Sequence, residues 1–193
     1  MNKLKSFQEI LSVGYIYLIA IGILSETFYY KQIGVNILSY SGILDVLMSP
    51  IAKLTSSITT LIVFFVVLFL VFQLPRFLVK KRAKNWFQKS FKLDENATNA
   101  QVESSLLKTF LFLLSVSLFG FFIGTGIGQG FKLADKIEND EIKYTDHVTF
   151  IDGEKINVRI VGVNSSYLFY LKKDNKTVQI APIGGVVKSI ENQ

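Results

Sequence analysis

Two stretches without any charged residue limit what this chain can fold into. The first covers residues 55–75 and the second covers 109–131, and each is bounded on both sides by lysine or arginine. The hydrocarbon core of a bilayer is about 30 Å thick, and a helix needs about 20 apolar residues to cross it. Helices that are apolar on every face are rare in soluble proteins. Both stretches therefore predict membrane-spanning helices.

A third apolar stretch near the N-terminus is shorter. It runs over residues 10–25, and the aromatic residues Phe28, Tyr29 and Tyr30 follow it, as at a membrane interface. Because Lys3 and Lys5 precede it, a cleaved signal peptide is the alternative, but no clear cleavage site follows. We expect an uncleaved span. Residues 1–131 are thus predicted to form a transmembrane unit with spans at about 10–28, 55–75 and 109–130.

The distribution of lysine and arginine predicts the orientation of the spans. The link at 76–108 holds eight of them against three acidic residues, whereas the link at 26–54 holds only Lys31 and Lys53. Loops rich in lysine and arginine stay in the cytoplasm. We therefore expect a multi-pass protein of a bacterial inner membrane with a cytoplasmic N-terminus and an extracytoplasmic C-terminal domain.

The basic link is also a candidate membrane-surface segment, because its cations are interleaved with aromatic residues. Such cations are attracted to anionic lipids next to a span. Basic and aromatic residues together can bind RNA as well, but the position directly after a span favours lipid, and we expect no nucleic-acid partner. The predicted membrane-surface residues are Arg76, Lys80, Lys81, Arg82, Lys84, Trp86 and Phe87.

Residues 33–52, between the first two spans, carry apolar residues at helical spacing. Gly42 and Pro50 are expected to break this segment into short pieces. We predict an interfacial or re-entrant helix on the outer face. A packed connector and a functional element such as a pore helix or a partner surface both remain open.

Glycines dominate the third span. Gly120, Gly124 and Gly128 recur at intervals of four and share one helical face, and Gly126 and Gly130 form a second row beside it. Helices in lipid associate where small residues let their backbones approach closely. The row of Gly120, Gly124 and Gly128 is therefore the predicted helix-packing face. Packing within the chain and self-association between chains are both compatible with it.

The periodicity changes from helical to strand-like in the C-terminal part. A charged link at 132–146 leads into 147–193, where short alternating segments are separated by turn residues such as Asp152-Gly153 and Gly184-Gly185. The expected fold class is α+β, with three transmembrane helices followed by a small five-stranded SH3-like β-barrel. Tyr167, Phe169 and Tyr170 are either its core or a candidate partner face.

The sequence contains few residues that could form a catalytic, metal or cofactor site. It has no Cys and a single His, so thiolate metal sites, disulfides and histidine clusters are excluded. No nucleophile–base pair or phosphate-binding loop is recognisable, and we expect no catalytic residue, metal or cofactor. The charge-free parts of the spans hold only Tyr15 and Tyr17 as ionisable residues. Coupled transporters usually need a charged residue there, which argues against transport.

The sequence therefore favours a non-enzymatic bacterial inner-membrane scaffold or assembly protein. It would contact membrane lipids and associate with itself or with partner membrane proteins. The alternative is a membrane effector or accessory protein of an antiviral system, for example a CRISPR-associated one, acting through oligomerised spans or as a pore.

The topology can be tested with a reporter that is active only in the cytoplasm. Fused after Gln193, it should be silent, because the basic link holds 76–108 inside and three spans then place the C-terminus outside. The same reporter inserted in the basic link is the positive control. Strong activity after Gln193 would reverse the orientation.

Overall fold

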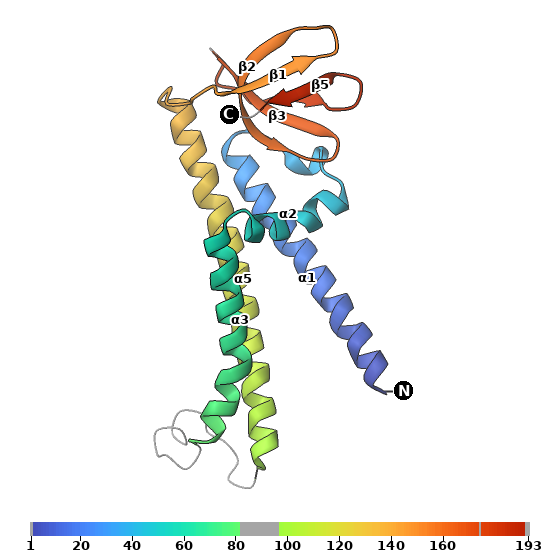
Figure 1. Ribbon diagram of the computed structural model, residues 1–193, viewed down its shortest axis with the longest axis vertical. Helices are drawn as coiled ribbons and strands as arrows, with labels where there is room; N and C mark the ends of the chain where they lie inside the picture. The colour runs from blue at the N-terminus through green and yellow to red at the C-terminus, as the bar shows by residue number, and fades with distance from the viewer. Residues whose placement is uncertain (1, 82–96, 174, 192–193) are drawn as a thin grey trace. The chain divides into compact units, whose positions relative to one another are not determined.

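The computed structural model describes residues 2–81, 97–173 and 175–191 and shows an α+β protein (Figure 1). Its helices are α1 (Asn2–Gln32), the 3-10 helix η1 (Ile37–Ser39), α2 (Ile43–Thr55), α3 (Ile58–Val79) and α5 (Asn99–Glu138). Its strands are β1 (Asp146–Phe150), β2 (Lys155–Val163), β3 (Tyr167–Lys172), β4 (Gln179–Pro182) and β5 (Val187–Glu191).

The chain divides into two compact units. One comprises Met1–Ile51 and Phe122–Gln193, and the other comprises Ala52–Phe121. The first unit contains α1, η1, most of α2, the second half of α5 and the whole sheet. The second contains α3 and the first half of α5.

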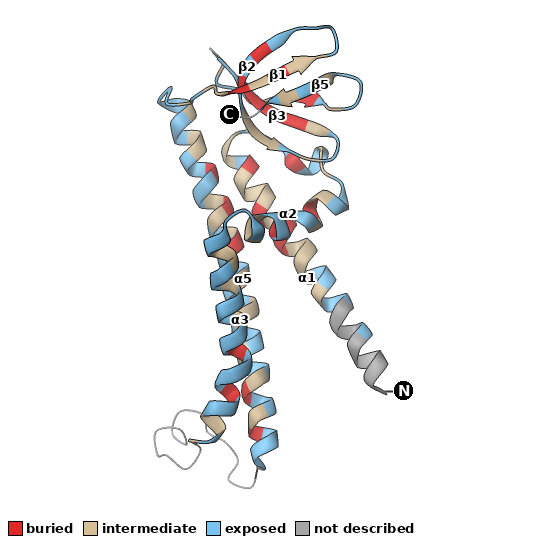
Figure 2. Cartoon of the chain, viewed as in Figure 1, coloured by how far each residue is buried: buried red, intermediate tan, exposed pale blue. Residues whose placement is uncertain are grey.

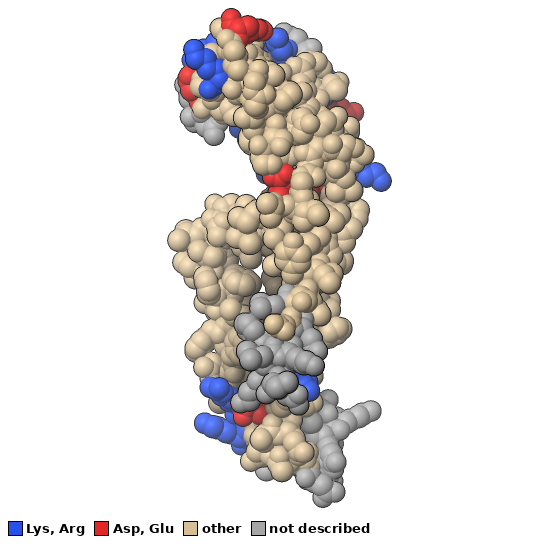
Figure 3. Space-filling model, turned by 90° about the vertical axis from the view of Figure 1, so that its right-hand side faces the viewer, with Lys and Arg blue, Asp and Glu red and all other residues tan. Residues whose placement is uncertain are grey.

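Three helices are long and apolar enough to cross a bilayer, as the sequence predicted. The candidate spans are Ser12–Gln32, Ile58–Val79 and Asn99–Glu138. Large apolar side chains on them point outward, and Phe69 and Phe112 are more than half exposed (Figure 2). The helical surface seen in Figure 3 carries few charged side chains. Such a surface is unfavourable in water and suits lipid.

The first span differs from the prediction in one respect. The helix continues without a break past the first apolar stretch, so the span at Ser12–Gln32 includes Glu26 and Lys31. The expectation of Tyr15 and Tyr17 as the only ionisable residues concerned the charge-free stretch at 10–25, and the candidate span extends beyond that stretch. The Glu26 carboxylate accepts a hydrogen bond from the Ser49 hydroxyl of α2, which supplies a polar partner that the sequence pattern did not reveal.

The segment at 33–52 folds into η1 and α2. Gly42 separates them, as predicted, but Pro50 lies inside α2 instead of breaking it. Because proline has no N–H, the Val46 carbonyl loses its usual helical donor. That carbonyl lies against Gly22 of α1, where a Cβ atom would overlap it. Glycine in one helix and proline in the other thus allow α1 and α2 to cross in contact.

In the second unit α3 pairs with the first half of α5. Val102 and Leu106 are buried against Leu78, Val79 and nearby apolar residues. The Arg76 Nε lies 3.4 Å from a Glu103 carboxylate oxygen. The link that follows is only partly seen, and the predicted surface residues Arg82, Lys84, Trp86 and Phe87 lie outside the described residues.

The second glycine row of α5 packs against α1. A Cβ at Gly126 would overlap the Ser25 carbonyl, and a Cβ at Gly130 would lie 2.7 Å from the Tyr29 carbonyl. The Ser25 hydroxyl also donates to the Phe122 carbonyl at 2.9 Å. By contrast, a Cβ at Gly120, Gly124 or Gly128 would meet no described atom within 4 Å. The contact within the chain therefore uses the row beside the predicted one.

The five strands form one antiparallel sheet with the order β4-β3-β2-β1-β5. The sequence pattern predicted strands at 148–151, 156–163, 167–171, 177–181 and 186–190, and each lies within two residues of the observed ends. The sheet is open, since its edge strands β4 and β5 do not pair, and the predicted SH3-like barrel is not confirmed. A physical reason is visible in β4, which has only four residues and ends at Pro182, a residue that cannot donate a ladder hydrogen bond.

The sheet is nevertheless strongly curled. In a flat sheet the outer strands would lie about 19 Å apart, yet only residues 183–186 connect them, and these fold into turns. A five-step connection reaches about 18 Å even when fully extended. The curled inner face encloses one apolar core, formed by Val148, Ile156, Val158, Leu168, Tyr170 and Ala181.

The outer face of the sheet forms a second core with the helices. Phe169, Leu171 and Val178 are buried together with Tyr30, Val35 and Ile37, which belong to the end of α1, the turn after it and η1. The rings of Tyr30 and Phe169 lie 5.1 Å apart. The Tyr30 hydroxyl occupies the place that a Cβ at Gly162 would take. Gly162 lies at a register shift between β2 and β3, and glycine inside a strand often marks such a bulge.

The charged link predicted at 132–146 is half helical. α5 continues to Glu138, and a turn with Asp140 at φ 57° then leads towards β1. The Lys176 Nζ lies 2.8 Å from the Glu138 carbonyl and 3.2 Å from an Asp140 oxygen. This end of α5 is therefore tied to the β3–β4 connection.

Two neighbouring glycines of α5 provide a matched test of helix packing. Gly126→Leu should lower the free energy of unfolding by about 1–3 kcal/mol or more, because its side chain collides with α1. Gly124→Leu should leave the fold intact, since its site is open. Thermal unfolding in a mild detergent measures the first effect. A loss of oligomer size in Gly124→Leu alone would show that the open row packs between chains, and equal destabilisation of both variants would contradict the packing described here.

Candidate partner-binding site

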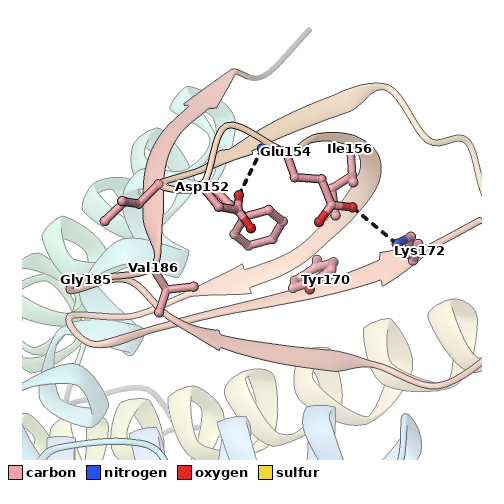
Figure 4. Close-up of a pocket in the computed structure, with 9 residues that line it drawn as sticks. Asp152, Glu154, Ile156, Tyr170, Lys172, Gly185 and Val186 are labelled. Carbon is pink, nitrogen blue, oxygen red and sulfur yellow. Dashed lines mark hydrogen bonds and ion pairs between the residues drawn. The ribbon is translucent and has the colours of Figure 1, made fainter.

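A shallow pocket opens on the inner side of the curled sheet (Figure 4). Its volume is about 530 Å³. The walls come from the end of β1, the β1–β2 turn, β2, β3 and the turn before β5. The lining residues are Phe150, Ile151, Asp152, Glu154, Ile156, Tyr170, Lys172, Gly185 and Val186.

Two tight turns build the rim of this pocket. Gly153 has a φ of 93° and Gly185 a φ of 76°, conformations that glycine adopts without strain. The Ile151 amide donates to the Val186 carbonyl at 3.0 Å, which joins the two turns. The Asp152 carboxylate accepts the Glu154 amide at 2.9 Å and holds the first turn in place. The turn residues of the sequence thus determine the shape of the pocket mouth.

Tyr170 is the polar group at the apolar base. Its side chain is only 7% exposed, and its hydroxyl has no hydrogen-bond partner among the described residues. Burial, assisted by the charge of Glu154, raises the pKa of the Tyr170 phenol above its ordinary value of 10.0. The group therefore stays protonated at physiological pH and can donate or accept one hydrogen bond.

Charged side chains surround the apolar base. Glu154 and Lys172 lie 3.9 Å apart and form an exposed ion pair, while Asp152 adds a second carboxylate (Figure 4). Two negative charges and one positive charge leave the rim with a net charge of −1. Ile151 and Val186 add exposed apolar surface. This combination suits an apolar side chain with a neighbouring cation.

The three aromatic residues proposed as a partner face do not share one face. Phe169 is fully buried in the core between the sheet and α1, and Tyr167 makes an edge-to-face contact with Tyr40, with ring centroids 5.3 Å apart. Tyr170 lies on the opposite face of the sheet and lines the pocket. Alternation along β3 separates them in this way. Of the three, only Tyr170 is placed to meet a ligand in this pocket.

Polar contacts also attach the loop between β2 and β3 to α2. The Asp45 carboxylate accepts hydrogen bonds from the Ser165 amide at 3.0 Å and the Ser165 hydroxyl at 3.1 Å. It also accepts the Gly42 amide at the start of α2. Asn164 donates to the Tyr40 carbonyl at 3.0 Å. The sheet is thus held to α1 by apolar packing and to α2 by hydrogen bonds.

The predicted membrane-surface residues that can be seen keep local partners. Lys81 lies 4.1 Å above the Phe77 ring, and Arg76 pairs with Glu103. Lys80 follows directly after α3 and is exposed. These three cations lie together at the end of one apolar helix, as expected for residues at a lipid headgroup layer.

Within residues 2–81, 97–173 and 175–191 no three His, Asp or Glu side chains come together in a way that could hold a metal ion. The single histidine, His147, places its Nδ1 2.7 Å from the Asn157 amide oxygen, which is away from the pocket. Comparisons with protein-family models, curated proteins and solved structures gave no match.

Only part of this site could be predicted from local sequence patterns. Both glycine turns were recognisable, but nothing in the linear pattern indicated that they would lie side by side. Asp45 and Ser165 are separated by 120 positions, so their contact also had no sequence signal.

The Asp45 contact predicts a pH dependence. Burial opposes ionisation of Asp45, but hydrogen bonds from Gly42 and Ser165 outweigh it and hold its pKa below the ordinary 3.8. The ionised form therefore stabilises the fold above the ordinary pKa, and this contribution disappears as the pH falls through the lower, folded-state pKa. Asp45→Asn should cost on the order of 1 kcal/mol at pH 6, since the site is partly exposed.

Thermal unfolding of the wild type and Asp45→Asn at pH 6 and pH 2.5 measures this contribution. The difference in melting temperature should shrink strongly at the lower pH. Glu141→Gln, at an exposed carboxylate in the link before β1, is the control. A difference that persists unchanged at pH 2.5 would show that the Asp45 charge does not stabilise the fold.

Proposed function

We propose that this chain is a non-enzymatic membrane scaffold that presents a partner-binding β domain next to the bilayer. The observation that carries the proposal is the difference between the two faces of the sheet. Its outer face is closed against α1 and η1 of the same chain, whereas its inner mouth remains open as a pocket. A domain attached in this way keeps one orientation relative to its anchoring helix.

The attachment explains why a scaffold is favoured over a tethered, freely moving module. Tyr30 fills the space above Gly162, and Asp45 binds Ser165 on a second helix. Two contacts at different positions restrain rotation as well as translation. A pocket held at a fixed orientation favours recognition of a partner that is itself bound to the membrane, because the ordering cost of binding is then reduced.

The membrane and orientation follow from the charge pattern. We propose a bacterial inner membrane with the N-terminus in the cytoplasm and the β domain on the outer side, because the lysine and arginine residues concentrate at 76–108.

Self-association through the row of Gly120, Gly124 and Gly128 is also part of the proposal. It is supported by the absence of any described atom within 4 Å of a Cβ placed there.

Site-specific photocross-linking tests the partner-binding role. A benzophenone amino acid at Val186, on the pocket rim, should cross-link to one discrete protein in native membranes. The same probe at Ser189, an exposed position on β5 outside the pocket lining, is the matched control. Adding Glu154→Lys should weaken the Val186 cross-link at least several-fold, because it breaks the pair with Lys172 and changes the net charge of the rim from negative to positive, which repels a cationic partner.

Two outcomes would argue against this function. Equal cross-linking at Val186 and Ser189 would mean that the pocket is not the docking site. Cross-links from Val186 to lipid alone would mean that the pocket faces the bilayer and not a protein.

A further inference from the structure

A second concave site lies between α1 and α2, away from the sheet. It is an open groove of about 870 Å³ with almost entirely apolar walls. Seven of its eight lining residues are apolar, aromatic or glycine. They are Ser12, Gly14, Tyr15, Ile16, Tyr17, Leu18, Leu47 and Ile51.

The groove exists because the two helices cross instead of running side by side (Figure 1). They touch where Gly22 meets the Val46 carbonyl, and the lining residues of α1 lie one to three turns before that point. Gly14 leaves further space, since a Cβ there would meet no described atom within 4 Å. The crossing therefore holds open a space that neither helix fills.

The position of the groove within a candidate membrane span determines what can occupy it. Its α1 wall, residues 12–18, lies within the candidate span Ser12–Gln32. Its one aliphatic hydroxyl, on Ser12, is already donated to the Gln8 carbonyl at 2.9 Å. The phenols of Tyr15 and Tyr17 are the remaining polar side-chain groups of the wall. These are few for a space of this size, and stably bound water needs several polar partners. The groove is also continuous with the lipid-exposed surface of α1, where Ile16 is 66% exposed.

We propose that this groove binds an acyl chain of a membrane phospholipid. Its open form and apolar walls favour a flexible chain, which can follow the irregular surface between two crossing helices. An acyl chain can bend around the crossing, whereas a straight helix cannot. This lipid site is independent of the partner proposed for the β domain.

The full-length protein, purified in a mild detergent, allows bound lipid to be counted by native mass spectrometry. The wild type should retain about one phospholipid per chain. Gly14→Trp fills the groove and should reduce this lipid at least fivefold. Ile62→Trp, on an exposed position of α3 outside the groove, is the control and should retain lipid like the wild type.

A second variant tests the site without filling it. In a Trp86→Phe background, Leu47→Trp places the only tryptophan in the groove wall. Titration with dibrominated phosphatidylcholine in detergent should quench its fluorescence saturably, and unbrominated lipid should reverse the quenching. Phe65→Trp in the same background, an exposed position on α3, should show weaker quenching without saturation.

Three results would overturn the proposal. The first is unchanged lipid retention in Gly14→Trp together with identical quenching curves for the two tryptophan positions. The second is a change in subunit number in Gly14→Trp, which would assign the groove to a second copy of the chain. The third is a wild-type protein that carries no lipid and shows no saturable quenching.

Discussion

The contact between Tyr30 and Gly162 is the interaction on which the rest of the first unit depends. A tyrosine at the end of the first helix occupies the space left by a missing side chain in the second strand. Phe169 and Val35 complete an apolar core around it. Burying large aromatic side chains contributes several kcal/mol, and here that burial joins a candidate membrane-spanning helix to a sheet. The sheet would otherwise expose its outer face to water.

Glycines also leave the space for close approach at the other helix contacts. Gly22 admits the Val46 carbonyl, and Gly126 and Gly130 admit the backbone of α1. Hydrophobic burial gives no advantage between helices in lipid, so contact must come from close approach and from polar groups. The hydrogen bonds from Ser25 to Phe122 and from Ser49 to Glu26 supply the polar part. Glu26 is therefore compatible with a membrane helix because α2 brings a donor to it.

Two concave sites, the pocket on the sheet and the groove between α1 and α2, are open to ligands. The pocket on the sheet has a neutral phenol at an apolar base and charges at its rim, a combination typical of recognition sites. The groove between α1 and α2 has no charged lining residue, and its α1 wall lies within a candidate membrane span. The different chemistry of the two sites supports two different proposed ligands, a protein segment for the first and an acyl chain for the second. Neither proposal requires the other.

The sequence by itself determined the elements that depend on local patterns. Long charge-free stretches determined the apolar helices, and alternation with turn residues determined five strands nearly to their ends, because both signals come from neighbouring residues. Only the tertiary structure decided the rest. Which glycine row meets α1, whether the sheet closes, and which face of β3 is covered depend on contacts between distant residues. Glu26 with Ser49 and Asp45 with Ser165 leave no trace in local sequence, because each residue satisfies its partner only after the chain has folded.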